Sequence, residues 1–212
     1  MGDRDLILSL LRSCTHCGSF WGTTDILCGS CWERLERALL RGSSQEFGNY
    51  HFKVHSLLNW NHAEHNLIKN LIHGLKTGWA KSVYRRLAAF LDVKWPKESI
   101  LIPAPGPEHA KAWALAVSEL TGLEVQDFLI KFENGKQKTK SKLERQAIKM
   151  GLKQGIFRDH KSIIFVDDVV STGGTAFAAH RALGEPKNFE VCSIVCNPSW
   201  SSAGPRDQVS SN

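Results

Sequence analysis

Two adjacent carboxylates, followed by a loop of hydroxyls and glycines, are the residues best suited to chemistry. Asp167 and Asp168 come directly after the apolar run Ile163–Val166. Neighbouring acids repel each other and stay solvated unless a ligand uses them. Their oxygens can accept hydrogen bonds from two vicinal hydroxyls of a ribose, or hold Mg²⁺ through water. The pair therefore predicts a ligand site at the end of a buried strand.

The loop after the acids has the composition of a phosphate-binding turn. Ser171, Thr172 and Thr175 carry hydroxyl donors, while Gly173 and Gly174 let the backbone approach an anion without a Cβ in the way. Free N–H groups at the start of a following helix would face that anion. The alternative is an ordinary strand-to-helix turn with Thr175 as the N-cap. The combination with the acid pair favours a phosphate, although the spacing of a Walker loop is absent.

Four cysteines near the N-terminus form two C-x-x-C pairs. Ten residues separate Cys14 and Cys17 from Cys28 and Cys31. Each pair can present two thiolates from a tight turn, and a structural Zn²⁺ takes four. This pairing favours zinc over a redox pair or an iron–sulfur cluster. The metal would hold together a unit too small to have a core of its own.

Strands that alternate with helices in the second half of the chain predict an α/β fold with a parallel sheet flanked by helices. Apolar spacings of three and four indicate helices, and short apolar runs indicate strands. The expected helices span residues 5–12, 32–40, 62–75, 79–91, 108–120 and 175–183. The expected strands span 99–102, 161–166 and 189–196, with a further strand within 123–129.

Length and composition favour one α/β domain with a small appendage in a chain of 212 residues. We expect a zinc-binding unit over residues 1–45, the α/β domain over 50–197 and a disordered tail over 198–212.

No apolar run approaches the ~20 residues of a membrane span. The N-terminal segment has acids where a signal peptide would be basic. The sequence therefore predicts a cytoplasmic protein without membrane insertion.

Basic residues are concentrated in one segment of a chain with a net charge of +6. Residues 131–153 hold eight Lys or Arg and two acids. Such a segment suits a polyanion, either pyrophosphate or a nucleic-acid backbone, but a solvated loop explains the charge equally well.

Four histidines at 55, 62, 65 and 73 lack an H-E-x-x-H pattern, which favours ordinary surface or core positions. Lys76, after the helix that carries three of them, is a candidate to reach the ligand site.

The segment from Ile163 to Thr175 resembles the phosphoribosyl pyrophosphate signature of type I phosphoribosyltransferases. That signature has a hydrophobic strand, two acids, two apolar residues and a Thr-Gly-x-Thr-type loop. The resemblance implies that Asp167 and Asp168 bind the ribose hydroxyls, together with Mg²⁺ on the ligand, and that the loop binds the 5′-phosphate. In some purine-base members the first loop position is an Asp proposed as general base, whereas here it is Ser171.

A second stretch, Ile102–Pro105, resembles the Pro-Val-Pro element that holds pyrophosphate in the amidophosphoribosyltransferase and ComF branches. It implies a pyrophosphate loop at Ala104, Pro105 and Gly106, although a plain Pro-rich loop fits these residues as well. The order of motifs over residues 14–196 resembles the ComF (competence protein F) family, with its N-terminal double C-x-x-C. Where that family has Arg-Gly-Phe-Asn-Gln, this chain has Glu108–Ala112.

Two functions remain open at this point. In one, the protein is a phosphoribosyltransferase with an unknown acceptor and no assigned catalytic residue, linked through ComF to DNA uptake. In the other, it is a non-catalytic module that binds a nucleotide or phosphoribosyl pyrophosphate, and its basic segment holds single-stranded DNA or a competence protein.

Overall fold

The fold is taken from a computed structural model that describes most of the chain. The described ranges are residues 13–20, 26–40, 44–47, 52–76, 81–106, 108–132, 149–153 and 162–197. The expected helix at 5–12, the expected tail at 198–212 and most of the basic segment lie outside them. Within these ranges, none of the helices combines the length and apolar character needed to cross a bilayer.

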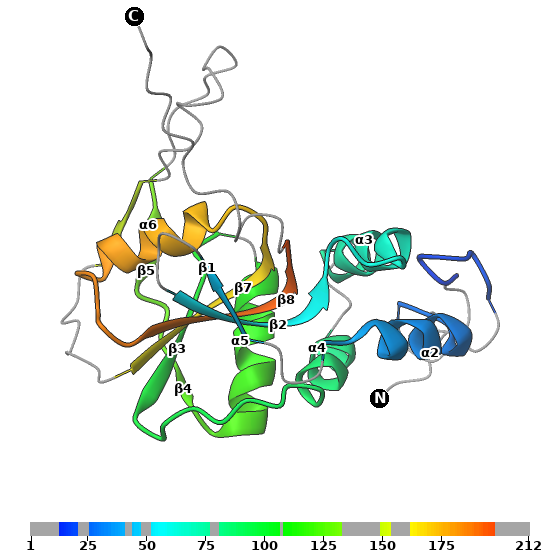
Figure 1. The fold of residues 1–212 in the computed structure, drawn as a ribbon, viewed down its shortest axis with the longest axis horizontal. Helices are drawn as coiled ribbons and strands as arrows, with labels where there is room; N and C mark the ends of the chain where they lie inside the picture. Colours follow the sequence, from blue (N-terminus) through cyan, green and yellow to red (C-terminus); the bar gives the residue numbers. More distant parts are fainter. Residues whose placement is uncertain are drawn as a thin grey trace, which may run out of the picture.

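A six-stranded sheet occupies the centre of the described structure (Figure 1). Its order is β1-β2-β8-β7-β3-β4, and every pairing is parallel except that of the edge strand β1 with β2. The strands are β1 (Ser44–Phe47), β2 (Phe52–Asn59), β3 (Ser99–Pro103), β4 (Glu124–Val125), β7 (Ser162–Val170) and β8 (Phe189–Cys196). A separate antiparallel hairpin consists of β5 (Leu129–Lys131) and β6 (Met150–Leu152).

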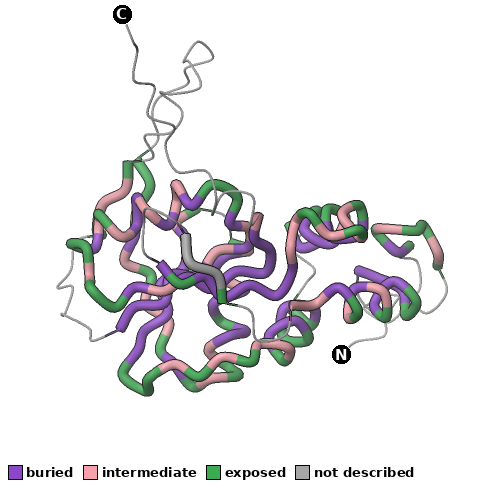
Figure 2. Tube along the Cα trace, in the orientation of Figure 1, coloured by how far each residue is buried: buried purple, intermediate pink, exposed green. Residues whose placement is uncertain are grey.

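Helices cover both faces of this sheet. They are α2 (Gly29–Ala38), α3 (His65–Leu75), α4 (Lys81–Ala88), α5 (Glu108–Thr121) and α6 (Gly174–Ala182). Helices α2 to α5 share one buried cluster with Leu101 and Ile164, whereas α6 shares another with Ile100 and Phe165. Figure 2 shows buried residues running through the sheet and along the inner sides of the helices. The predicted α/β fold, with its parallel sheet flanked by helices, is confirmed.

The chain crossovers diverge between β3 and β7. β3 leads through α5 to β4 on one side, and β7 leads through α6 to β8 on the other. The two strands are paired in parallel, with Pro103 opposite Val166. The loops that follow them therefore leave the sheet at a topological switch point, where open α/β sheets bind ligands in a crevice.

Two features of the sheet differ from the sequence prediction. β7 was expected to end at Val166, but it continues to Val170 because its ladder with β8 pairs Asp167 with Ser193 and Val170 with Cys196. The acid pair is thus held by the sheet itself. β1 and β2 were not predicted, since β2 mixes Lys53 and other polar residues with its apolar ones and takes its place only through pairing with the distant β8.

Candidate functional site

Asp168 is a buried carboxylate with two basic side chains beside it. Its side chain is 9% exposed, and its Oδ2 lies 3.6 Å from Lys76 Nζ and 3.4 Å from His109 Nε2. Among the described residues this Oδ2 has no hydrogen-bond partner. A buried oxygen that lacks a donor is costly, so a ligand hydroxyl that donated to it would be favoured. The prediction that Lys76 reaches the site is confirmed.

Asp167, the other acid, is turned away from Asp168 because successive side chains of a strand point to opposite faces. Its Oδ1 accepts a hydrogen bond of 2.9 Å from the Asp168 backbone N–H. Burial of the carboxyl, together with the charge of Asp168, raises the pKa of Asp167 to about 8, and Lys76 offsets this only in part. Two carboxyl groups held this close together are stabilised when a ligand or a cation neutralises part of their charge.

The loop after β7 forms the predicted turn into a helix. α6 begins at Gly174, and its N-cap is Gly173 rather than Thr175. Gly173 has a φ of +69°, in the left-handed region that favours glycine. The loop lines a small hollow of about 30 Å³ together with Asp167. Since the first N–H groups of a helix lack partners within it, this hollow suits an anion.

The Pro-x-Pro loop begins directly beside strand β7. The backbone N–H of Ala104 donates a hydrogen bond of 2.8 Å to the carbonyl of Val166. Gly106 has a φ of +128°, which again favours glycine, and a Cβ there would meet nothing within 4 Å. The two loops that the sequence had singled out, Ala104–Gly106 and Ser171–Thr175, therefore follow neighbouring parallel strands at the same edge of the sheet.

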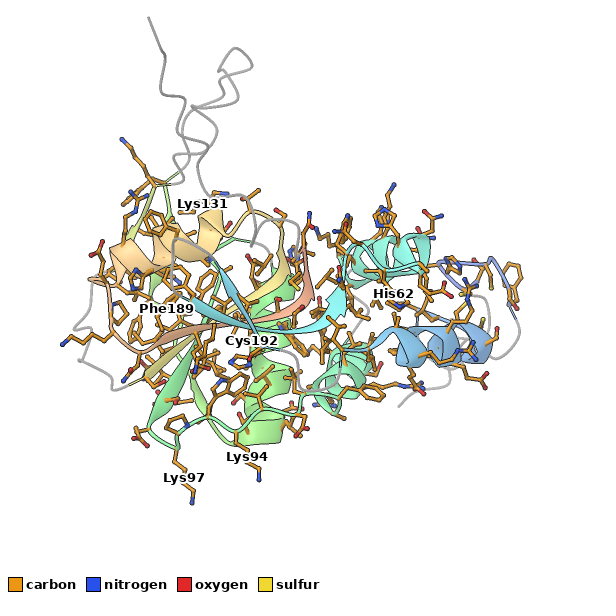
Figure 3. The ribbon with its side chains drawn as sticks, in the orientation of Figure 1. His62, Lys94, Lys97, Lys131, Phe189 and Cys192 are labelled. Atoms are coloured by element: carbon orange, nitrogen blue, oxygen red, sulfur yellow. The ribbon has the colours of Figure 1, made fainter. Side chains whose placement is uncertain are left out.

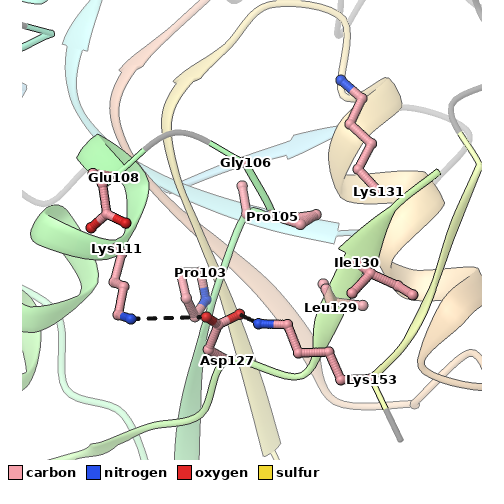
Figure 4. A pocket seen from close by; sticks show the side chains of 11 residues that line it. Pro103, Pro105, Gly106, Glu108, Lys111, Asp127, Leu129, Ile130, Lys131 and Lys153 are labelled. Atoms are coloured by element: carbon pink, nitrogen blue, oxygen red, sulfur yellow. Dashed lines mark ion pairs between the residues drawn. The ribbon is translucent and has the colours of Figure 1, made fainter. Parts of the chain in front are cut away.

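A cavity of about 340 Å³ opens beside the Pro-x-Pro loop (Figure 4). Lys153 Nζ lies 2.7 Å from Asp127 Oδ1, and Lys111 Nζ lies 3.9 Å from Asp127 Oδ2. Lys131 also lines the cavity, so both described ends of the basic segment reach it. The remaining lining residues are Pro103, Ala104, Pro105, Gly106, Glu108, Leu129 and Ile130. Three ammonium groups against two carboxylates favour an anionic occupant.

Sequence reasoning missed His109, Lys111 and Asp127. The two basic residues lie on the first turns of α5, within the run that departs from the ComF pattern, and Asp127 lies between β4 and β5. The only feature of the sequence that could have indicated these residues is their position. Residues that closely follow the carboxyl end of a parallel strand lie near the edge of the sheet where α/β folds bind ligands. The four histidines at 55, 62, 65 and 73 form no metal cluster in the described chain.

The cysteine quartet assembles as predicted. The sulfur atoms of Cys14, Cys17, Cys28 and Cys31 all lie within 4.8 Å of one another. Tetrahedral zinc with Zn–S bonds of about 2.3 Å places its sulfurs about 3.8 Å apart, so four thiolates here could hold such an ion. The Ser30 hydroxyl, 3.3 Å from the Cys28 sulfur, lowers the pKa of Cys28 to about 6.

Local backbone geometry explains how the four thiols meet. Gly18, with a φ of +74°, closes the first knuckle by donating to the Cys14 carbonyl. Cys28 is the N-cap of α2, and Cys31 lies in its first turn. The other two cysteines are buried core residues, as expected, and Figure 3 shows Cys192 within the sheet.

Comparison with known proteins gives distant likenesses only. No family model and no curated protein matches the sequence. Among solved structures, an allosteric regulatory enzyme of purine biosynthesis matches at 22% identity and a TM-score of 0.35, covering 54% of this chain and 24% of that one. This chain thus spans about a quarter of that enzyme's length.

Two further solved structures are phosphoribosyltransferases. A purine phosphoribosyltransferase from Pyrococcus horikoshii matches at 19% identity and a TM-score of 0.37, covering 61% of this chain and 80% of that one. An adenine phosphoribosyltransferase from Trypanosoma brucei, in complex with AMP, pyrophosphate and ribose-5-phosphate, matches at 15% identity and a TM-score of 0.37, covering 80% and 69%. At scores this low, the fold assignment rests on the strand order and pairing described above.

Proposed function

We propose that this chain binds phosphoribosyl pyrophosphate at the switch point between β3 and β7. Asp167 and Asp168 hold the ribose hydroxyls, the loop Ser171–Thr175 holds the 5′-phosphate and Ala104–Gly106 faces the pyrophosphate. The observation that supports the proposal is the switch point itself: β3 and β7 are paired in parallel, and the loops Ala104–Gly106 and Ser171–Thr175 follow these two strands at the same edge of the sheet. A diol, a phosphate and a second anion would each find matching groups there.

Mg²⁺ fits this proposal as a companion of the ligand rather than as an ion held directly by the protein. Lys76 and His109 flank the buried oxygen of Asp168, so a cation in direct contact with that oxygen would meet the like charge of the Lys76 ammonium. Asp167, which lines the hollow beside the Ser171–Thr175 loop, could hold Mg²⁺ through water. When bound, the ion would neutralise pyrophosphate charge, while the chain's own lysines do the same at the Ala104–Gly106 loop.

As an enzyme, the protein would transfer the phosphoribosyl group. A nucleophile on the acceptor attacks C1 of the ribose, the bond from C1 to the pyrophosphate oxygen breaks, and pyrophosphate leaves with that electron pair. Lys111, Lys131 and Lys153 line the cavity next to the loop, where they would stabilise the leaving anion. The acceptor and its general base are not assigned, because Ser171 carries no carboxylate.

Calorimetric titration with phosphoribosyl pyrophosphate and Mg²⁺ tests the site. The wild type should bind, and Asp168→Ala should weaken binding by at least about tenfold, since a charge-assisted hydrogen bond contributes about 1.5–3 kcal/mol. Lys69→Met, on the exposed side of α3, is a matched control that should bind as the wild type does. Equal heats for wild type and Asp168→Ala, or none for either, would sink the proposal.

A non-catalytic module is the second candidate, and the hydroxyl of Ser171 in place of a general base favours it. In the ComF setting, such a module would act in DNA uptake, with the basic segment on single-stranded DNA or a competence protein. Pyrophosphate release should then be absent over a panel of bases, amines and DNA despite binding. DNA binding should fall steeply with salt and should be lost when Lys136, Lys138 and Lys140, outside the described residues, are neutralised.

The cysteine quartet, we further propose, holds one structural Zn²⁺. Four thiolates fill a tetrahedral ion, so no position is open for substrate. Metal analysis of the purified chain should find close to one zinc per molecule. A content well under one would refute the assignment.

A further inference from the structure

Helix α3 joins the cysteine unit to the acid pair. Figure 1 shows α2 and α3 side by side at one end of the molecule, with the start of the described chain next to them. The buried cysteines, Trp32 and the inner residues of α3 belong to one hydrophobic cluster that also includes Ile164 and Val166 of β7. The unit that would hold the metal is therefore packed against the same core as the ligand site.

Polar contacts fix α3 against the cysteine unit along its length. At its start, the Arg34 guanidinium forms an ion pair with Glu64 through two nitrogens. In its middle, Asn70 Nδ2 lies 3.2 Å from Nδ1 of His16, which sits between Cys14 and Cys17. Bidentate pairs of this kind constrain orientation as well as distance.

The last turn of α3 packs most closely of all. A Cβ on Gly74 would lie 3.1 Å from Ile26 Cδ1 and 3.3 Å from Thr15 Cγ2. Those two residues are themselves tied together, because the Thr15 N–H and hydroxyl both donate to the Ile26 carbonyl at 2.9 Å. Thr15 lies between the thiols of the first knuckle, so the position of this turn depends on how the knuckle is held.

Lys76 follows Gly74 by two residues, a distance of about 3 Å along a helix. Its backbone N–H donates to the His73 carbonyl and closes α3, and its ammonium reaches Asp168 at 3.6 Å. A movement of the last turn by an ångström or two would therefore change the Lys76–Asp168 contact, whereas His109, on α5, would stay in place.

We propose that the cysteine unit is a positioning element for the acid-pair site. When its thiolates hold a metal ion, the unit holds the last turn of α3, and Lys76 is kept beside Asp168. Lys76 is then a positioning residue that keeps the Asp168 carboxylate oriented for the ribose hydroxyls. This inference rests on the proposed function, and it adds that loss of the metal lowers ligand affinity without removing a residue that touches the ligand.

The test uses ribose 5-phosphate as the probe, because its binding can be measured without Mg²⁺ and a chelator then acts only on the cysteine site. Binding is measured by calorimetry on the full chain, metal-loaded and after chelation, with circular dichroism to verify the fold. Chelation should weaken binding of the wild type by about tenfold, the effect of one charge-assisted contact. In Lys76→Met, already weakened, chelation should have no further effect.

A second variant keeps the thiolates intact in case chelation unfolds the chain. Gly74→Val places a side chain against Ile26 and Thr15 and should weaken binding as chelation does, with zinc content unchanged. Adding Ile26→Ala, which reopens the space, should restore most of the affinity. Lys76→Arg should bind almost as the wild type does, and Lys69→Met should respond to chelation like the wild type.

The outcomes separate this inference from the proposed function. If the metal-loaded wild type does not bind ribose 5-phosphate, the proposed site itself is wrong. If it binds, but neither chelation nor Gly74→Val changes affinity, the positioning role of the cysteine unit is overturned. If chelation or Gly74→Val lowers the affinity of Lys76→Met as much as it lowers that of the wild type, the unit acts on the site through general stability rather than through Lys76. That result also overturns the inference.

Discussion

The raised pKa of the Asp167 carboxyl group leads to a prediction of how the stability of the ligand-free protein depends on pH. Its pKa is raised from 3.8 to about 8 in the folded chain, chiefly by burial. Between these values the folded state binds a proton that the unfolded state has released. Stability from this group is therefore fully present below pH ~4 and is lost as pH rises to ~8.

The magnitude follows from the linkage of one proton. The slope from one such group is at most about 1.4 kcal/mol per pH unit. Other groups titrate over the same range, but those that do not interact with Asp167 cancel when the wild type is compared with Asp167→Asn, which keeps the shape of the side chain and removes the charge. Urea unfolding from about pH 5 to about pH 8, with zinc loaded and no ligand, should show Asn gaining stability relative to Asp as pH rises.

Asp168→Asn provides the internal control. The charge of Asp168 raises the pKa of Asp167, so neutralising Asp168 should move the pH range in which stability falls to lower pH. Parallel stability curves for wild type and Asp167→Asn across the whole range would refute the reasoning, because they would mean that Asp167 titrates alike in both states.

Three further predictions concern the metal and the two loops. Cys31→Ser should lose the zinc and lower the melting temperature, whereas Cys192→Ala, buried in the sheet, should keep the metal as measured by elemental analysis. Gly173→Ala and Gly184→Ala, at φ +69° and +81°, should each cost about 1–2 kcal/mol of stability in urea unfolding, yet only the first should weaken ribose 5-phosphate binding. Lys153→Ala should weaken pyrophosphate binding several-fold in calorimetry, and Lys97→Ala, away from the cavity, should not.

Much of the fold followed from local patterns in the sequence. The apolar spacing of α3 and α5 and the apolar run of β8 predicted these elements, with β8 at Phe189–Cys196 in both. The composition of the β7 loop predicted a turn into a helix, because glycines and hydroxyl residues after an apolar run favour one, and the double C-x-x-C predicted a cysteine cluster, because paired knuckles at this spacing suit one metal ion. Each of these motifs consists of residues close together in the sequence, so it can be recognised without knowing the fold.

What could not be predicted depends on pairing across the chain. β2 takes its place inside the sheet by lying beside β8, more than a hundred residues later, and it alternates apolar and polar residues only over its first half. The contact of His109 with Asp168 likewise depends on how α5 crosses from β3 over the sheet, which fixes the direction of its first turn. Contacts of this kind leave no local pattern in the sequence, and they determine the positions of most of the residues around the proposed ligand site.

The acid pair itself is hard to explain as a structural feature. A structural ion pair buried in a sheet would be expected to satisfy its oxygens, because an unsatisfied buried carboxylate oxygen costs about 1–3 kcal/mol or more. Instead, Asp168 Oδ2 has two basic neighbours beyond ordinary hydrogen-bond geometry, and Asp167 is held with a raised pKa. Sites that break local rules in this way are expected where a ligand completes the missing interactions. Hydroxyl donors aimed at Asp168 and a phosphate at the start of α6 would do so together, which is the arrangement that one phosphorylated ribose offers.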